Sequence, residues 1–243
     1  MPKKKSTNMT PVDVWFASQG WTSQAFQREV WAQMLAGKSG LLNAPTGTGK
    51  TYAVWGGIVN AAMAKTSLED KTGLRAIWIT PLRALANEIA ESAQRMCDGV
   101  GLPWKVGTRT GDTSTKERAA QKKMLPHLLV TTPESLHVML STKGAADLFK
   151  QLDWFVADEW HELLGSKRGV QVELALSRLR ALRPSMRTWG ISATIGNIEE
   201  AMEAARRLVL EGKFEIDAAA LEGTLDVDAA GLARSALADA AIT

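Results

Sequence analysis

The sequence predicts an α/β fold in which a doubly wound, mainly parallel sheet carries helices on both faces. Short apolar runs alternate with longer segments of helical length, which is the pattern of strands joined by crossover helices. Several of the short runs are apolar at nearly every position, as expected for strands covered on both faces. The length of 243 residues suits one large domain, or one domain with an appendage.

The expected elements follow each other along the chain from residue 40 onward. The strands are the apolar runs 40–44, 76–80, 104–108, 128–132, 154–158 and 188–192. The helix-length segments between them include 52–64, 84–96 and 170–182. The first run stops at a loop of small residues, the second and fourth at Thr-Pro, and the fifth at two acidic residues. Because ligands of such sheets bind beyond the carboxyl ends of the strands, these loops should converge on one edge.

Composition and charge limit the classes of protein. Hydrophobic residues make up 45% and charged residues 23%, as in ordinary globular proteins. No apolar run approaches the ~20 residues that span a bilayer, and the N-terminus MPKKKSTNMT has no apolar stretch typical of a signal peptide, so we expect no membrane partner. The single cysteine excludes an internal disulfide and suits a reducing, cytoplasmic location.

The charge is distributed unevenly along the chain. Residues 198–243 hold ten acidic and four basic side chains, which gives them a net charge of −6. Since the whole chain has a net charge of +3, residues 1–197 have a net charge of +9. This distribution is compatible with binding a polyanion, although ordinary solvated surface charge explains it equally well. We expect a flexible basic N-terminus at 1–14, a folded domain at 15–210 and an alanine-rich acidic tail at 211–243.

The loop after the first strand has the residue types of a phosphate-binding loop. Its glycines allow a tight turn that brings backbone N–H groups close to phosphate oxygens, and the following helix start adds its positive dipole end. The lysine can reach the β- and γ-phosphates, and the last hydroxyl can ligate Mg²⁺. The first residue departs from the usual glycine. The loop consists of Ala44, Pro45, Thr46, Gly47, Thr48, Gly49, Lys50 and Thr51.

A second chemical feature is the acidic pair after the fifth strand. Asp158 can hold Mg²⁺ through its water shell, and Glu159 can orient and deprotonate an attacking water. An acidic pair alone is usually a helix cap or a solvated loop. Together with the lysine loop, it favours nucleoside triphosphate hydrolysis, with ATP and Mg²⁺ as cofactors and Lys50, Asp158 and Glu159 as catalytic residues.

Several motifs in order resemble a known family. DEWH at 158–161, with the phosphate loop upstream and Ser192-Ala193-Thr194 downstream, resembles the DExH-box helicases of superfamily two. DEWHELLGSKRGVQ at 158–171 and GISATIGN at 190–197 resemble the large helicase-related (Lhr) family, and the tryptophan in the box resembles its bacterial branch named for association with a DNA ligase. The resemblance covers about residues 15–210. It implies the first RecA-like domain of a P-loop NTPase that works as an ATP-dependent DNA helicase in DNA repair.

The resemblance also assigns roles to further residues. Gln27, 23 residues before Lys50, occupies the position of the glutamine that reads adenine, with Gln24 and Gln33 as alternatives. His161, Ser192, Ala193 and Thr194 are expected to couple nucleotide state to movement. Trp160 is expected to contact a neighbouring domain, whereas tryptophans inside the strands are expected in the core.

Three loops look like the motifs that grip a nucleic-acid backbone without reading its sequence. They supply hydroxyls, exposed N–H groups, a helix start and arginines. Thr-Pro-Glu before a helical stretch is also an ordinary helix start, which is the alternative interpretation. The expected nucleic-acid-binding residues are Pro81, Arg83, Arg109, Gly111, Thr132, Pro133 and Glu134.

A helicase of this kind needs a second RecA-like domain, and no strand-helix set for it is expected after residue 197. We therefore expect weak binding of ATP and of single-stranded or partly single-stranded DNA, poor ATP hydrolysis and no unwinding without a second domain in cis or in trans. A DNA ligase or repair proteins are further partners that the family implies. The alternatives are a non-catalytic nucleotide- or DNA-binding regulatory module and a non-functional remnant. DNA against RNA remains open from the residues alone.

Overall fold

The computed structural model describes residues 9–65, 73–163 and 166–192. Within these ranges it contains one six-stranded sheet with the order β1-β6-β5-β2-β4-β3, in which every neighbouring pair is parallel. The predicted parallel α/β sheet is confirmed. The strands are β1 (Gly40–Asn43), β2 (Ala76–Ile79), β3 (Val106–Arg109), β4 (Leu128–Thr131), β5 (Trp154–Ala157) and β6 (Arg187–Ser192).

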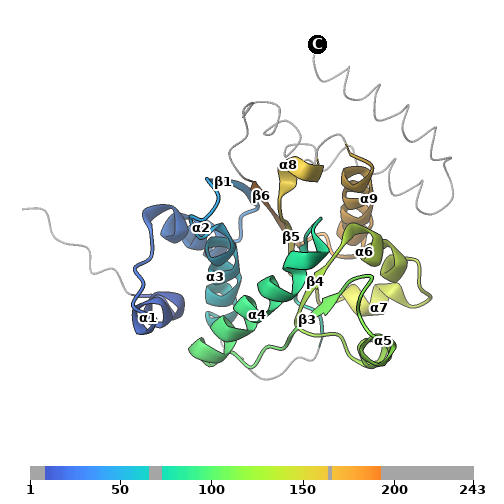
Figure 1. The fold of residues 1–243 in the computed structure, drawn as a ribbon, viewed down its shortest axis with the longest axis horizontal. Coiled ribbons are helices and arrows are strands. Elements are labelled where there is room, and N and C mark those ends of the chain that lie inside the picture. Colours follow the sequence, from blue (N-terminus) through green and yellow to red (C-terminus); the bar gives the residue numbers. More distant parts are fainter. Residues whose placement is uncertain (1–8, 66–72, 164–165, 193–243) are drawn as a thin grey trace, which may run out of the picture.

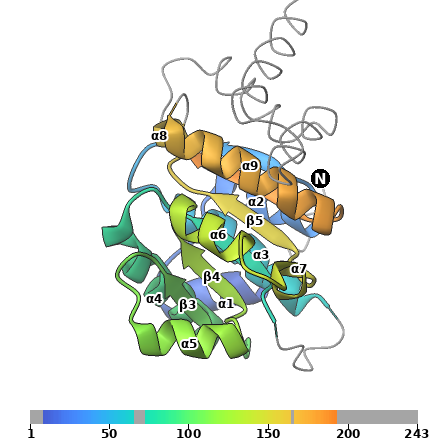
Figure 2. The same cartoon turned by 90° about the vertical axis from the view of Figure 1, so that its right-hand side faces the viewer.

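Helices cover both faces of this sheet (Figure 1). Their bounds are α1 (Pro11–Ser18), α2 (Ala25–Leu35), α3 (Lys50–Met63), α4 (Arg83–Val100), α5 (Thr115–Lys123), α6 (Pro133–Leu140), α7 (Ala145–Phe149), α8 (Trp160–Leu163) and α9 (Lys167–Leu182). Figure 2 shows α6, α7 and α9 lying across the face of the sheet that is turned toward the viewer.

Alternation along the strands divides the core between the two faces. Ala76 and Trp78 of β2 pack with α1, α2, α3 and α4, whereas Ile77 and Ile79 pack with α6, α7, α8 and α9. This alternation follows from the two-residue period of a strand, and both faces are apolar because both are covered. The result is a three-layer arrangement in which the central strands β2, β4 and β5 are buried at every position between the two helical layers.

The folded part begins earlier than the expected boundary at residue 15. Thr10 caps α1 in a reciprocal capping box with Asp13, and Pro11 occupies the first turn. Val12 is fully buried in the core. Residues Pro11–Val14 therefore belong to the folded body, while the expected end at 210 and the tail 211–243 lie outside the described residues.

The tryptophans that lie in strands behave as core residues, and so does Trp160, which we expected to contact a neighbouring domain. Trp78, Trp154 and Trp189 are buried, as predicted. Trp160 is only 1% exposed and packs in the same apolar cluster as Leu163 and Val172, so its expected contact with a neighbouring domain is wrong. The short helix α8 turns this side chain inward against the sheet. No helix in the described part of the chain is long and apolar enough to cross a membrane.

Candidate functional site

The order of the strands sorts the predicted motifs into two halves of one edge. The carboxyl ends of β1, β6 and β5 carry the glycine-rich loop, Ser192 and the acidic pair, respectively. The ends of β2, β4 and β3 carry the three loops expected to grip a nucleic-acid backbone. Because all six strands are parallel, both groups lie on the same edge, and they meet where β5 pairs with β2.

The loop after β1 has the backbone of a phosphate cradle. Gly47 (φ 77°) and Gly49 (φ 84°) are in the left-handed region, which other residues enter only at a cost. Lys50 begins α3, is 7% exposed, and donates from Nζ to the Ala44 carbonyl at 2.7 Å. The lysine thus spans the loop from its last residues to its first. Thr51 follows in the first turn of α3.

The other loop residues leave the cradle accessible. Pro45, Thr46 and Gly47 are exposed, and the Thr48 hydroxyl donates to the Pro45 carbonyl at 2.7 Å. This bond closes the loop through a side chain and leaves the backbone N–H groups of the turn available. Exposed N–H groups, a buried lysine and a helix start are the features that bind a triphosphate, so the loop fits ATP.

Two glutamines of the α2 region reach this loop. Gln27, 4% exposed, donates from Nε2 to the Gly49 carbonyl at 3.2 Å and accepts from the Gln24 N–H at 2.9 Å. Gln24 donates to the Thr48 carbonyl at 3.4 Å. Gln33 instead bonds to Glu29 on an exposed surface. Of the three candidates for reading adenine, Gln27 and Gln24 are therefore beside the loop and Gln33 is not.

Asp158 is a buried carboxylate at the centre of the edge. It is 7% exposed and accepts hydrogen bonds from Trp78 Nε1 at 3.0 Å and from the Glu159 N–H at 2.9 Å. Burial, with a smaller contribution from the charge of Glu159, raises the pKa of Asp158 to about 6, against the opposing effects of these hydrogen bonds and of Lys50. The charge of Lys50 acts on this carboxylate, so the lysine that begins α3 and the acidic pair lie near each other.

The backbone is strained next to this carboxylate. Among the described residues, Glu159 is the one non-glycine residue with a positive φ, at 47°. Such outliers persist where the surrounding structure holds them, often at functional sites. The conformation turns the Glu159 carboxylate to within 3.4 Å of His161 Nδ1.

His161 connects the acidic pair to the end of β6. Its Nδ1 lies 3.1 Å from the Ser192 hydroxyl as well as beside Glu159. This contact agrees with the expected link between the histidine and the Ser-Ala-Thr motif. Ala193 and Thr194 lie outside the described residues. The described residues contain no cluster of three or more His, Cys, Asp or Glu side chains suited to a metal ion. Thr51 and Asp158 together fit Mg²⁺ held chiefly by phosphates and water, as in many nucleotide sites.

The other half of the edge brings Arg83, which follows the loop after β2, close to the loop after β3. Arg83 is exposed at the start of α4, and a Cβ added to Gly111 would lie 2.9 Å from its Nη1. Arg109 is half-buried at the end of β3 and donates to Gln121 at 3.4 Å. Burial, and then the charge of Arg118, lowers the pKa of Arg109.

Arg118 is a residue that sequence reasoning missed. Its guanidinium donates to the carbonyls of Thr113 at 2.9 Å and of Gly111 at 2.8 Å, and so fixes the loop after β3. No motif in the sequence marks it, since it lies on α5, six residues after the motif Arg109-Thr110-Gly111-Asp112.

The loop after β4 is both a helix start and part of this edge. Thr132 caps α6 by accepting from the Ser135 N–H at 3.4 Å, and Pro133 occupies the first turn. Both are buried. The alternative interpretation as an ordinary helix start is thus confirmed, and it does not remove these residues from the edge.

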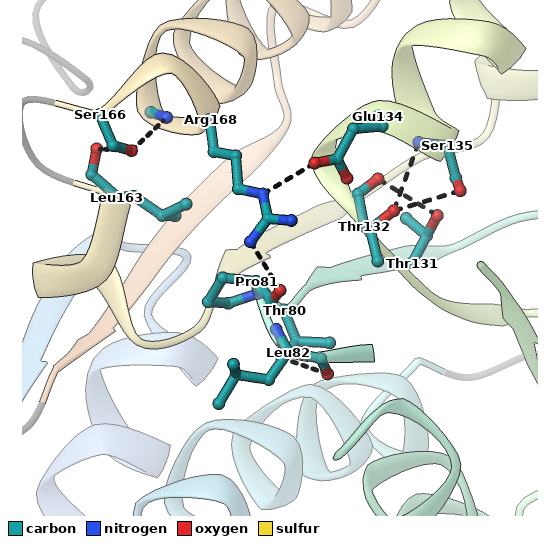
Figure 3. A network of polar contacts seen from close by, with 11 residues as sticks. Thr80, Pro81, Leu82, Thr131, Thr132, Glu134, Ser135, Leu163, Ser166 and Arg168 are labelled. Atoms are coloured by element: carbon teal, nitrogen blue, oxygen red, sulfur yellow. Dashed lines mark hydrogen bonds and ion pairs between the residues drawn. The ribbon is translucent and has the colours of Figure 1, made fainter. Parts of the chain in front are cut away.

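Glu134 has a partner that the sequence did not predict. Arg168, near the start of α9, donates from Nε to Glu134 Oε1 at 2.8 Å and from Nη1 to the Pro81 carbonyl at 3.3 Å (Figure 3). One guanidinium therefore joins the loops after β2 and β4. Arg168 stands inside the stretch DEWHELLGSKRGVQ, but no spacing rule pairs it with a residue 34 positions earlier.

Comparison with known proteins agrees with this geometry. Residues 24–201 match the family model described as DEAD/DEAH box helicase. The chain is 35% identical over 205 residues to ATP-dependent helicase Lhr-Core protein 2 of Thermococcus barophilus, covering 78% of this chain and 23% of that protein. It is 33% identical over 198 residues to the Lhr helicase/probable uracil glycosylase of Mycolicibacterium smegmatis, covering 76% of this chain and 13% of that protein.

The solved structures show the same relationship. The structure of Mycobacterium smegmatis helicase Lhr bound to ssDNA and AMP-PNP matches with a TM-score of 0.70 and 30% identity, over 81% of this chain and 26% of that one. The chain thus spans about a quarter or less of the length of these relatives. The chain belongs to the DEAD/DEAH box helicase family, where it corresponds to the first RecA-like domain of Lhr-type ATP-dependent helicases.

Proposed function

We propose that this chain binds ATP with Mg²⁺ at one half of its sheet edge and single-stranded nucleic acid, with DNA as the expected substrate, at the other half. It would serve as the first motor domain of an Lhr-type DNA helicase. The observation that carries this proposal is the division of the edge, in which β1, β6 and β5 end in nucleotide motifs and β2, β4 and β3 end in backbone motifs.

In the nucleotide half, the loop backbone and Lys50 would hold the phosphates. For this, the Lys50 ammonium must exchange its hydrogen bond with the Ala44 carbonyl for phosphate oxygens. Thr51 and Asp158 would hold Mg²⁺, which when bound neutralises phosphate charge. Glu159 would orient and deprotonate the attacking water, because its carboxylate lies next to Asp158 at the end of β5 and within 3.4 Å of His161 Nδ1.

In the other half, Arg83, Arg109 and the polar backbone around Gly111 and Thr132 would contact phosphates. Such contacts bind without reading sequence, as a strand-tracking motor requires. Support comes from the related Mycobacterium smegmatis helicase, whose structure contains ssDNA and AMP-PNP. Glu134 is assigned a supporting role, because its carboxylate faces Arg168 and would repel a phosphate.

Strand separation would require a second RecA-like domain, in cis or in trans. In related phosphoryl-transfer sites an arginine finger contributes ~10³–10⁵ in rate. We therefore propose slow ATP hydrolysis by this chain alone and no duplex unwinding. DNA repair, and association with a DNA ligase, are the setting that the family resemblance suggests.

The test is Mg²⁺-dependent ATP hydrolysis by the chain, with and without single-stranded DNA, beside a Lys50→Ala variant of equal thermal stability. We expect the unmodified chain to bind nucleotide and to hydrolyse ATP slowly or not at all. Lys50→Ala should lose both the nucleotide binding and any hydrolysis. Nucleotide binding that is unchanged by Lys50→Ala would overturn the assignment of the ATP site.

A further inference from the structure

The first turn of α9 lies between the acidic pair and the two loops that follow β2 and β4. Arg168 points out of this turn, and its guanidinium contacts Glu134 and the Pro81 carbonyl at once (Figure 3). The two contacts use different nitrogens, Nε and Nη1, of one planar group. A lysine has a single ammonium and no such fork, so it cannot reproduce this geometry.

The same turn is fixed to α8. A Cβ added to Gly169 would lie 1.9 Å from the Leu163 carbonyl oxygen, so the start of α9 packs against α8 at a distance that only glycine allows. Ser166 bridges the two helices, since its hydroxyl donates to the Leu163 carbonyl at 2.8 Å and accepts from the Gly169 N–H at 3.1 Å. Because α8 begins directly after Glu159, Arg168 is held by the segment that carries the acidic pair.

The negative charge of Glu134 explains why Arg168 pairs with it. Burial raises the pKa of Glu134, but hydrogen bonds from its own backbone N–H, from Arg168 and from Thr132 outweigh it and hold the pKa below its usual range. The carboxylate is therefore ionised at neutral pH, on an edge proposed to bind phosphates. Arg168 neutralises it and leaves the neighbouring helix start free to attract an anion.

We propose that Arg168 is a positioning residue, which holds the loops after β2 and β4 in one arrangement and ties both to the segment carrying the acidic pair. The proposal rests on the proposed function, because the loops are those assigned to nucleic acid. A competing explanation is that Arg168 itself contacts a phosphate, since its side chain is 46% exposed. The two explanations differ in what a lysine at this position would do.

The test compares Arg168→Lys with Arg168→Ala by fluorescence anisotropy of a labelled oligo(dT) strand, at several salt concentrations. If Arg168 positions the loops, both variants should bind on the order of tenfold more weakly, as expected when phosphate contacts are misplaced. If it acts only as a charge against phosphate, Arg168→Lys should bind like the unmodified chain, which would overturn the proposal. The matched control is Arg95→Ala, an exposed arginine on α4 whose loss should leave the affinity unchanged.

A double-mutant cycle adds a second criterion. Glu134→Ala and Arg168→Ala should not be additive, because either change alone breaks the bridge. Additive losses of affinity would argue against a shared role. Nucleotide affinity, measured with AMP-PNP and Mg²⁺, should stay within about twofold in all these variants, because none of them touches the lysine loop.

Hydrogen exchange separates this proposal from the proposed function. The backbone N–H groups of Leu82, Leu85, Ser135 and Leu136 are hydrogen-bonded within the two loops. In Arg168→Lys without any ligand, hydrogen exchange should become faster at these N–H groups after β2 and after β4. It should stay unchanged at residues 44–50. Unchanged exchange at the two loops would overturn the role of Arg168 even if the chain binds DNA. Absence of DNA binding by the unmodified chain, with faster exchange in the variant, would instead overturn the proposed function alone.

Discussion

The buried carboxylate Asp158 should make the fold less stable as pH rises, and Asp158→Asn should remove this dependence. Its pKa of about 6 in the folded state exceeds the ordinary value of 3.8, foremost because of burial. The folded state therefore holds a proton that the unfolded chain has released, so stability is greatest below the ordinary value and is lost as pH rises through 6. At ~1.36 kcal/mol per pH unit, ionising Asp158 in the folded state costs about 3 kcal/mol at pH 7.5.

The substitution removes this cost but disturbs two hydrogen bonds. The carboxylate accepts from Trp78 Nε1 and from the Glu159 N–H, whereas an asparagine offers one acceptor oxygen. A buried donor left unpaired costs ~1–3 kcal/mol, so the net gain at pH 7.5 lies between about 0 and 2 kcal/mol. The dependence on pH is the sharper quantity. Between pH 5 and 7.5 the unmodified chain should lose about 1.4 kcal/mol that the variant keeps.

The assay is thermal unfolding followed by circular dichroism between pH 5 and 8, with EDTA and without nucleotide. A stability change of 1 kcal/mol shifts the melting temperature by ~2–4 °C. The difference in melting temperature between the variant and the unmodified chain should therefore grow by about 3–6 °C from pH 5 to pH 7.5, in favour of the variant. Asp98→Asn, a change of an exposed aspartate on α4, is the matched control and should follow the unmodified chain. Parallel curves for the unmodified chain and Asp158→Asn would refute the assignment of a raised pKa to this carboxylate.

Three further substitutions test particular contacts. Gly169→Ala should destabilise the fold by ~1–3 kcal/mol, because its methyl group overlaps the Leu163 carbonyl; an unchanged melting temperature would contradict the close packing of α8 and α9. Gly49→Ala should weaken AMP-PNP binding, because an alanine at φ 84° costs about 1–2 kcal/mol and its Cβ would lie 2.8 Å from the Gln27 side chain. Equal affinity of the variant and the unmodified chain in a titration would contradict this loop geometry. His161→Ala should leave the separate affinities for nucleotide and for oligo(dT) nearly unchanged, but it should reduce the effect of bound nucleotide on the affinity for oligo(dT). A thermodynamic cycle that gives an unchanged coupling free energy would exclude the proposed role of His161.

The sequence predicts the strands well because each is an uninterrupted apolar run. β2, β4 and β5 differ from their predicted runs only at the last residue, which turns toward the functional edge. Alternation of strands and helices was enough to predict a parallel sheet. It does not determine the order β1-β6-β5-β2-β4-β3, because strand order depends on how the crossover helices pack.

Contacts between distant segments account for the features that sequence reasoning missed. Arg168 and Glu134 meet because α9 packs across α6, which no local pattern reveals. The burial of Trp160 likewise depends on where α8 folds back. The early start of α1 is different, because Thr10, Pro11 and Asp13 form a capping signal that can be read from the sequence.

The measurement that tests the central claim most directly is a pair of binding titrations on two variants. Lys50→Ala and Arg83→Ala are each titrated with AMP-PNP and Mg²⁺ and with labelled oligo(dT), after their melting temperatures are matched to that of the unmodified chain. If the edge is divided as proposed, Lys50→Ala loses nucleotide binding and keeps DNA binding, whereas Arg83→Ala weakens DNA binding and keeps nucleotide binding. If either variant loses both, or if neither loses its own ligand, the division of the sheet edge into a nucleotide half and a nucleic-acid half is contradicted.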